Sequence, residues 1–218
     1  MFQTLFLKTS VILAGSLFMA YIGSRISSGI FQRALQTGNP EKIKTTMWTA
    51  LIVNIIAFLL LVFFKSNLLL SFVFMFAFTL SSGFTLGIYT LTNPEAVQKA
   101  TAITALTTLV TGLIASYSGI DFSWLGKILF FALLAVIVIS VIGLFVKMKS
   151  GLNRIISAAA VLIFTGYLLF DFNNLAKLKN VAEANNWSTA LDFAVNIYLD
   201  IINLLINLIS LLSGSSNN

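Results

Sequence analysis

Five polar side chains recur along the last apolar segment of the chain, at spacings of four, four, three and four residues. They are Asp192, Asn196, Asp200, Asn203 and Asn207. On an α-helix this spacing places all five side chains on one face, which we call the polar seam. A carboxylate near the middle of a spanning helix costs about 2.5–3.5 kcal/mol on insertion scales and usually faces a bundle interior or water. The polar seam is therefore the first candidate for an ion pathway.

A second carboxyl group, that of Asp171, closes the preceding apolar segment. The connection between the two segments is short, which favours an antiparallel helix pair. Asp171 would meet Asp200 if the last helix starts late or if the connection dips inward. Two carboxyl groups that meet share a proton more cheaply than both ionise, so the pair would be a pH sensor without histidine. In the alternative, Asp171 caps the connection and Asp200 bonds a neighbouring helix.

Composition indicates which elements position these groups. Of 218 residues, 58% are hydrophobic and 9% are charged, against roughly 25% charged in soluble domains. The mean hydropathy is +0.98, and each apolar run is near the 20 residues or so that cross a bilayer. We predict an all-α, multi-pass membrane protein: a single domain over residues 1–212 and a disordered polar tail over 213–218. The expected spans are 5–23, 46–64, 68–90, 97–117, 123–146, 152–170 and 190–212.

The absence of cysteine and histidine excludes several functions. It rules out disulfides, Cys/His zinc sites, a thiol nucleophile and a Ser-His-Asp triad. The chain also has no Gly-rich phosphate loop, so we expect neither an enzyme nor a resident cofactor. The net charge of +6 fits attraction to anionic lipid rather than to nucleic acid.

Small and hydroxylated residues in the third and fourth spans favour close helix packing over pore lining. Gly83 and Gly87 are four residues apart in the third span. The fourth span carries a row of threonines, which are Thr101, Thr104, Thr108 and Thr111. The longest connection is expected to run from about Ser24 to Thr45, between the first two spans.

The last two segments resemble the signature end of the transmembrane Bax inhibitor motif family. The matching stretches are AVLIFTGYLLFDFNNLAKL and ALDFAVNIYLDIINLLINLISLL. The family pattern falls on Phe164, Tyr167, Asp171, Tyr198, Leu199, Asp200, Asn203 and Leu204. Weaker matches continue upstream in FAFTLSSGFTLG and in DFSWLGKILFFALLAVIVISVIGLF, so the resemblance covers all seven spans.

The resemblance implies a bundle with the seventh helix central and with Asp171 and Asp200 paired at its core. It implies a proton-sensitive calcium leak in bacterial members, and calcium handling with suppression of cell death in eukaryotic ones. Lys65 matches a basic position at the end of the second span and could be a removable counter-ion of the pair. The resemblance also implies a cytoplasmic N-terminus, and we adopt this orientation. The positive-inside rule favours the opposite orientation, because 8 basic residues then fall inside and 5 outside.

One departure from the family bears on calcium. Asn54 stands in the second span, where relatives can carry an acidic residue. Calcium prefers several hard oxygen ligands, with carboxylates supplying charge. With at most Asp171, Asp200 and Asp192 available, we expect a weak, transient calcium site rather than a high-affinity cage, which suits an ion that must also leave. Asn54 itself is assigned to the polar ion pathway.

Three functions remain open at this stage. The first is a proton-gated calcium or cation leak channel, with calcium and protons as its partners in a bacterial plasma (inner) membrane. The second is a membrane-embedded interaction protein that modulates a membrane-bound protease or other quality-control machinery; it predicts that both aspartates can be neutralised without effect. The third is a proton-coupled transporter of small solutes, which would favour inverted repeats and broken helices. Neither of those features is found in the sequence.

Overall fold

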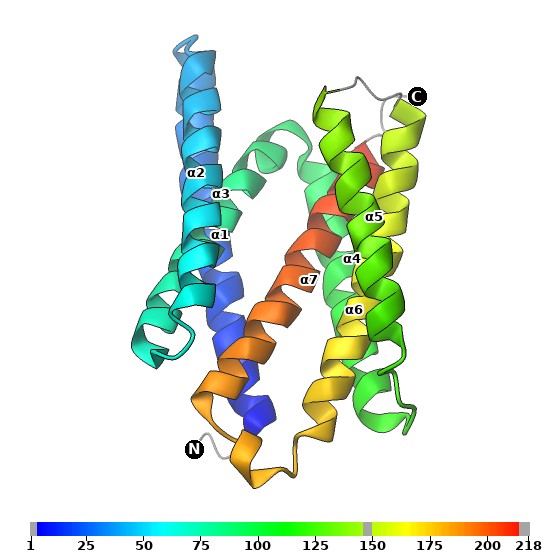
Figure 1. Ribbon diagram of the computed structural model, residues 1–218. Coiled ribbons are helices and arrows are strands. Elements are labelled where there is room, and N and C mark those ends of the chain that lie inside the picture. The colour runs from blue at the N-terminus through cyan, green and yellow to red at the C-terminus, as the bar shows by residue number, and fades with distance from the viewer. Residues whose placement is uncertain (1–3, 146–149, 214–218) are drawn as a thin grey trace. The chain divides into compact units, whose positions relative to one another are not determined.

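The chain is helical throughout the part that the computed structural model describes, residues 4–145 and 150–213. Seven helices are each long and apolar enough to cross a membrane, and no strand occurs in the described ranges. The helices are α1 (Leu5–Gln36), α2 (Pro40–Phe63), α3 (Leu68–Thr92), α4 (Pro94–Tyr117), α5 (Leu125–Phe145), α6 (Ser150–Lys177) and α7 (Trp187–Ser213), with the short 3₁₀ helix η1 (Ala182–Ala184) before α7 (Figure 1). The all-α, seven-span prediction is confirmed. Of the expected polar tail, residues 214–218 lie outside the described residues.

The first helix is longer than the sequence predicts. The connection expected from Ser24 to Thr45 is instead helical to Gln36, and α2 begins at Pro40. Polar residues can continue a helix beyond the apolar core, and no proline interrupts this stretch. The turn comes where Gly38 adopts a φ of 65°, which suits glycine because it lacks a Cβ. Asn39 then caps α2 by accepting a hydrogen bond from the backbone N–H of Lys42.

The sixth helix also extends beyond its predicted end at residue 170. It continues to Lys177, so Asp171 lies inside α6 rather than at its terminus. The last helix begins at Trp187, slightly before the predicted start at residue 190. The sequence left open the alternative that Asp171 caps the connection, and its place inside α6 rules this out. The late start of the seventh helix, one of the two expected routes to an Asp171–Asp200 contact, does not occur.

The described helices group into two compact units. The first unit contains residues 1–94 and 182–195, in which α1, α2 and α3 pack against one another. Its closest approach is between α1 and α3, where a Cβ built on Gly83 would lie 2.0 Å from the carbonyl oxygen of Ala20. Gly87 approaches Ser27 in the same way, so the packing role predicted for Gly83 and Gly87 is confirmed.

The second unit contains residues 95–181 and 196–218, and in it α5 packs against α6. The threonines of α4 bond their own helix: the hydroxyls of Thr101, Thr108 and Thr111 donate to carbonyls four residues earlier. This agrees with the packing interpretation of the threonine row. Helix α7 belongs to both units, and 44% of its most apolar stretch is buried, the largest share among the seven spans. The central position expected for the seventh helix stays a prediction.

Candidate functional site

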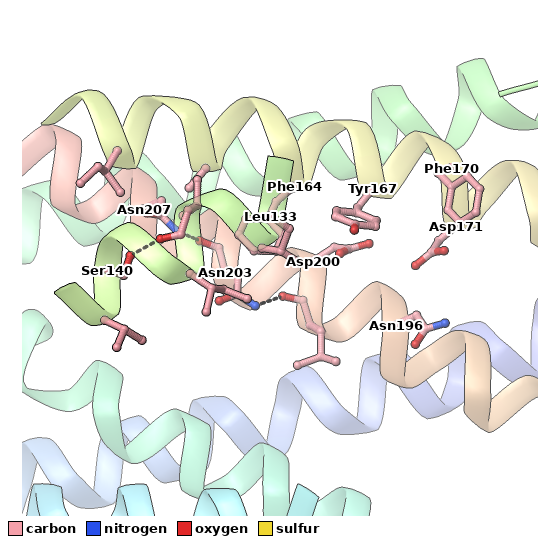
Figure 2. A pocket seen from close by; sticks show the side chains of 16 residues that line it. Leu133, Ser140, Phe164, Tyr167, Phe170, Asp171, Asn196, Asp200, Asn203 and Asn207 are labelled. Atoms are coloured by element: carbon pink, nitrogen blue, oxygen red, sulfur yellow. Dashed lines mark hydrogen bonds between the residues drawn. The ribbon is translucent and has the colours of Figure 1, made fainter. Parts of the chain in front are cut away.

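The Asp171 and Asp200 carboxyl groups meet within the second unit. Both side chains are buried, with exposed fractions of 7% and 5%, and both line the same cavity (Figure 2). A hydrogen bond between two carboxyl groups requires that one of them be protonated and donate. One carboxyl oxygen is left unsatisfied in this buried site. The Oδ2 atom of Asp200 receives no hydrogen bond from the described residues.

Local sequence explains how the two groups are presented. On α6, Phe164, Tyr167 and Asp171 follow at spacings of three and four residues, so they share one helix face. On α7, Asp200 lies in the polar seam and faces the same region (Figure 2). Tyr167 lines the same cavity as both carboxyl groups (Figure 2). It belongs to the family pattern, but the sequence did not single it out as a site residue.

A cavity of about 700 Å³ adjoins the pair. The seam of α7 forms one polar wall. Residues of α5 and α6 form the other walls, which are mostly apolar but include Ser140, Tyr167 and Asp171 (Figure 2). The residues that line it are Leu133, Val136, Ile137, Ser140, Val141, Ile156, Ala160, Phe164, Tyr167, Phe170, Asp171, Asn196, Leu199, Asp200, Asn203 and Asn207. Four of the five seam residues therefore lie on one cavity, as the helical spacing predicts. A space of this size is typical of a small-ligand site.

The two asparagines after Asp200 are oriented by their own helix. The Nδ2 atom of Asn203 donates to the carbonyl of Leu199 at 2.8 Å, and the Nδ2 atom of Asn207 donates to the carbonyl of Asn203 at 2.8 Å. Their Oδ1 atoms receive no hydrogen bond from any described group. Asp200, Asn203 and Asn207 follow one another along α7 on the cavity wall (Figure 2). This wall thus offers a row of hydrogen-bond acceptors.

The remaining predicted site residues belong to the first unit and are not among the residues that line this cavity. Lys65 forms an ion pair with Asp192, the first seam residue, at 2.9 Å, and both side chains are partly exposed. The ion pair of Lys65 is thus with Asp192, whereas the family resemblance suggests Asp171. Asn54 lies at the contact between α2 and α3, where its Nδ2 atom donates to the Phe78 carbonyl at 3.0 Å and to the Ser82 hydroxyl at 2.7 Å. The Asn54 side chain therefore links α2 to α3.

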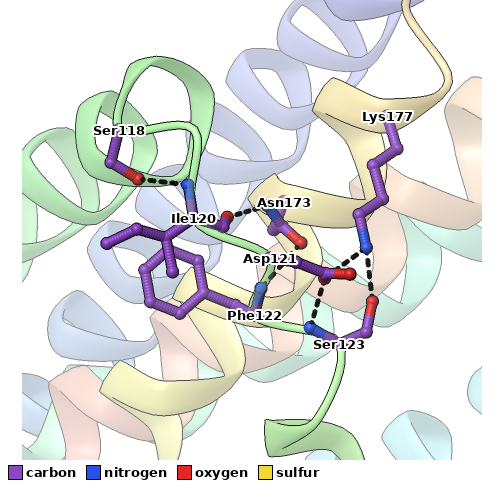
Figure 3. Close-up of polar contacts among 7 residues, drawn as sticks. All are labelled: Ser118, Ile120, Asp121, Phe122, Ser123, Asn173 and Lys177. Carbon is purple, nitrogen blue, oxygen red and sulfur yellow. Dashed lines mark hydrogen bonds and ion pairs between the residues drawn. The ribbon is translucent and has the colours of Figure 1, made fainter.

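A polar cluster that the sequence did not predict lies between α4 and α5 (Figure 3). The Lys177 ammonium at the end of α6 contacts the Asp121 carboxylate and the Ser123 hydroxyl. The hydrogen bond from Lys177, with further bonds from Ser123, lowers the pKa of the exposed Asp121 carboxyl from 3.8 to about 2. Asn173 binds the same loop through the backbone of Ile120 and Phe122. The cluster fixes the loop to α6, near the site but outside its cavity.

A second unpredicted cluster holds the start of α7 in the first unit. The Lys8 ammonium donates to the Asn185 carbonyl at 2.8 Å and lies 5.8 Å from the centre of the Trp187 ring. Trp187 also packs edge-on against Phe72. Among the described residues, no group of three or more His, Cys, Asp or Glu side chains could hold a metal ion. The carboxyl pair with its amide neighbours is therefore the candidate functional site among the described residues.

Seven apolar helices with a buried carboxyl pair define a multi-pass α-helical membrane protein with an intramembrane ionisable site. Residues 2–218 match the family described as Inhibitor of apoptosis-promoting Bax1. The chain therefore belongs to the Bax inhibitor family, as the motifs of its last two spans suggested.

Relatives of this chain occur in bacteria, plants and viruses. An uncharacterized protein of Helicobacter pylori strain J99 is 31% identical over 216 residues, which are 95% of this chain and 85% of that protein. Protein LIFEGUARD 1 of Arabidopsis thaliana is 36% identical over 63% of this chain and 57% of its own length. The Golgi anti-apoptotic protein of Vaccinia virus is 33% identical over 64% of this chain and 56% of its own length.

Proposed function

We propose that the protein is a passive, proton-gated conduit for calcium or other cations, gated by Asp171 and Asp200. The observation that carries this proposal is the buried carboxyl pair at a cavity whose polar wall consists of oxygen acceptors. Intramembrane carboxyl groups that face a cavity mark ion and proton pathways.

The gate is the proton that the two carboxyl groups share. When the proton is present, a hydrogen bond holds the groups together; when it leaves, two like charges repel one another in a poorly solvated site. The charge of the cavity and the distance between α6 and α7 therefore change together with pH. Calcium enters as the transported ion, not as a resident cofactor. A site with two carboxyl groups and neutral amides holds it weakly, which allows it to leave.

The family and the composition bear on the membrane in which the protein is located. One of its relatives is a bacterial protein that aligns with nearly the whole chain. The chain carries 13 Lys and Arg residues against 7 Asp and Glu, which fits a membrane with anionic lipids. We assign the protein to the bacterial plasma membrane.

Calcium entry into liposomes that contain the purified protein tests the proposal. We expect a leak that changes across a pH series from about 5 to 8, because the shared proton leaves the pair as the pH rises, and that Asp171→Asn makes independent of pH. Asp121→Asn is the matched control, because it neutralises an exposed carboxylate outside the cavity. A leak no greater than that of empty liposomes, or one that Asp171→Asn leaves unchanged, would contradict the proposal. In that case modulation of a membrane protease by binding becomes the stronger candidate.

A further inference from the structure

The polar wall of the cavity presents side-chain oxygens along a line. The side-chain nitrogens of Asn203 and Asn207 are already bound to carbonyls of α7, which leaves their Oδ1 atoms facing outward from the helix. Asp200 adds a buried oxygen, Oδ2, that accepts no hydrogen bond from the described residues. The Ser140 hydroxyl across the cavity donates to the Val136 carbonyl of its own helix, so its oxygen is a further acceptor.

A ligand that binds these oxygens brings several hydrogen-bond donors. A single metal ion satisfies acceptors that converge on one point, whereas these acceptors are spread along the helix. From Asp200 to Asn203 the axial rise is about 4.5 Å, and from Asp200 to Asn207 it is about 10.5 Å. The matching ligand carries two donor groups at a separation within this range.

Charge narrows the class of ligand. The two carboxyl groups of the cavity, those of Asp171 and Asp200, can carry two negative charges. A dication neutralises them, and ammonium groups supply three donors each with no acceptor. Opposite the seam the lining is hydrocarbon from Leu133, Val136 and Ile156. The part of the ligand between its ammonium groups is thus a hydrocarbon chain.

We propose that this cavity binds a linear aliphatic diamine. One ammonium group binds the Asp171–Asp200 pair, the other binds the Oδ1 atoms of Asn203 and Asn207, and the methylenes lie against α5 and α6. With bonds of about 1.5 Å, four methylenes separate two nitrogens by about 6 Å, which falls between the two axial spacings of the seam. This inference concerns the same site as the proposed function, but binding of the amine does not depend on whether the protein conducts ions.

Calorimetric titration of the protein in lipid nanodiscs with a series of α,ω-diamines tests the inference. We expect saturable binding that is tightest for chains of about three to six methylenes and weaker for longer chains, whose second ammonium passes Asn207. A monoamine of equal length should bind about tenfold more weakly, because it lacks the second ammonium group and the hydrogen bonds that this group donates. Affinity that only rises with chain length would indicate partition into apolar surface and would overturn the proposal.

Two variants test the binding of the two ammonium groups separately. Asn203→Leu should weaken diamine binding about tenfold and leave monoamine binding unchanged, because it removes an acceptor used by the second ammonium only. Asp200→Asn should weaken both ligands, whereas Asp121→Asn, outside the cavity, should weaken neither. Equal diamine affinity in Asp200→Asn and the unaltered protein would overturn the proposal.

Binding and flux distinguish this inference from the proposed function. If the diamine binds and no calcium leak exists, the diamine site stands and the conduit fails. If a pH-dependent leak exists and no diamine in the series binds, the conduit stands and the diamine site fails. If both hold, the bound diamine should reduce the leak at concentrations that match its affinity.

Discussion

The contact between α1 and α3 is the part of the fold whose disruption can be calculated most directly. The Cα atoms of Gly23 and Gly83 leave so little room that a Cβ added at Gly83 would lie 2.0 Å from the Ala20 carbonyl oxygen and 2.7 Å from its carbonyl carbon. Even close C···O contacts are about 3.3–3.6 Å. Substitution Gly83→Ala therefore forces the two backbones apart by roughly 1 Å, because neither contacting atom belongs to a flexible side chain.

The cost follows from the loss of close packing along this interface. Overpacking of a well-packed site costs about 1–3 kcal/mol. The obstacle here is backbone, and Gly23 approaches the Leu80 carbonyl oxygen on the same interface at 2.1 Å from its added Cβ. We expect Gly83→Ala to lower the free energy of unfolding by at least about 2 kcal/mol, within the upper part of that range.

Gly29→Ala provides the matched control. Gly29 is also in α1, and an added Cβ there meets nothing within 4 Å. The same chemical change should be neutral or stabilising by up to about 1 kcal/mol, because alanine loses less backbone entropy in a helix. Reversible unfolding of both variants in mixed micelles measures the difference. If Gly83→Ala proves as stable as Gly29→Ala, the close approach of α1 and α3 is refuted.

Three further predictions concern polar contacts. Because the Lys65–Asp192 pair is partly exposed, a double-mutant cycle with Lys65→Met and Asp192→Asn should give a coupling of no more than about 1 kcal/mol for the unfolding free energy. Asn54→Leu removes interhelical hydrogen bonds and should destabilise the protein by about 0.6–1.7 kcal/mol in the same assay. The lowered pKa of Asp121, about 2, means that its contact with Lys177 stabilises the fold above the unfolded pKa near 4 and is lost as pH falls toward 2. The difference in unfolding free energy between the unaltered protein and Asp121→Asn should accordingly shrink over that interval.

The sequence predicts the polar wall of the site well, because helical spacing is a strict geometric constraint. Asn196, Asp200, Asn203 and Asn207 lie on one cavity. The orientation of the amides could not be predicted, since each asparagine can point its oxygen or its nitrogen outward and only the positions of nearby carbonyls decide between them. The acceptor row is thus a finding of the structure.

Helix ends were predicted less well than helix identity. Hydropathy follows the apolar stretch that crosses the bilayer, whereas a helix continues until a residue or a turn stops it. Gln36 and Lys177 therefore end α1 and α6 well after the apolar runs do. The extension of α6 places Asp171 within a helix, where it can meet Asp200.

Long-range ion pairs had no usable signal in the sequence. Lys65 and Asp192 are separated by 127 positions but lie 2.9 Å apart, and nothing local marks them as partners. The same holds for Lys8 and Asn185. The expected link between Lys65 and Asp171 came from the family resemblance, and it remains a prediction.

The central claim is that Asp171 and Asp200 act as one proton-sharing unit that gates a leak. Calcium flux across pH 5 to 8, compared for Asp171→Asn, Asp200→Asn and the double variant in liposomes of one composition, tests it most directly. Groups that act as a unit are non-additive, so we predict that the double variant has the same pH-independent flux as either single variant. If the effects of the two substitutions instead multiply, or if one variant retains the full pH response, the two carboxyl groups do not form the gate.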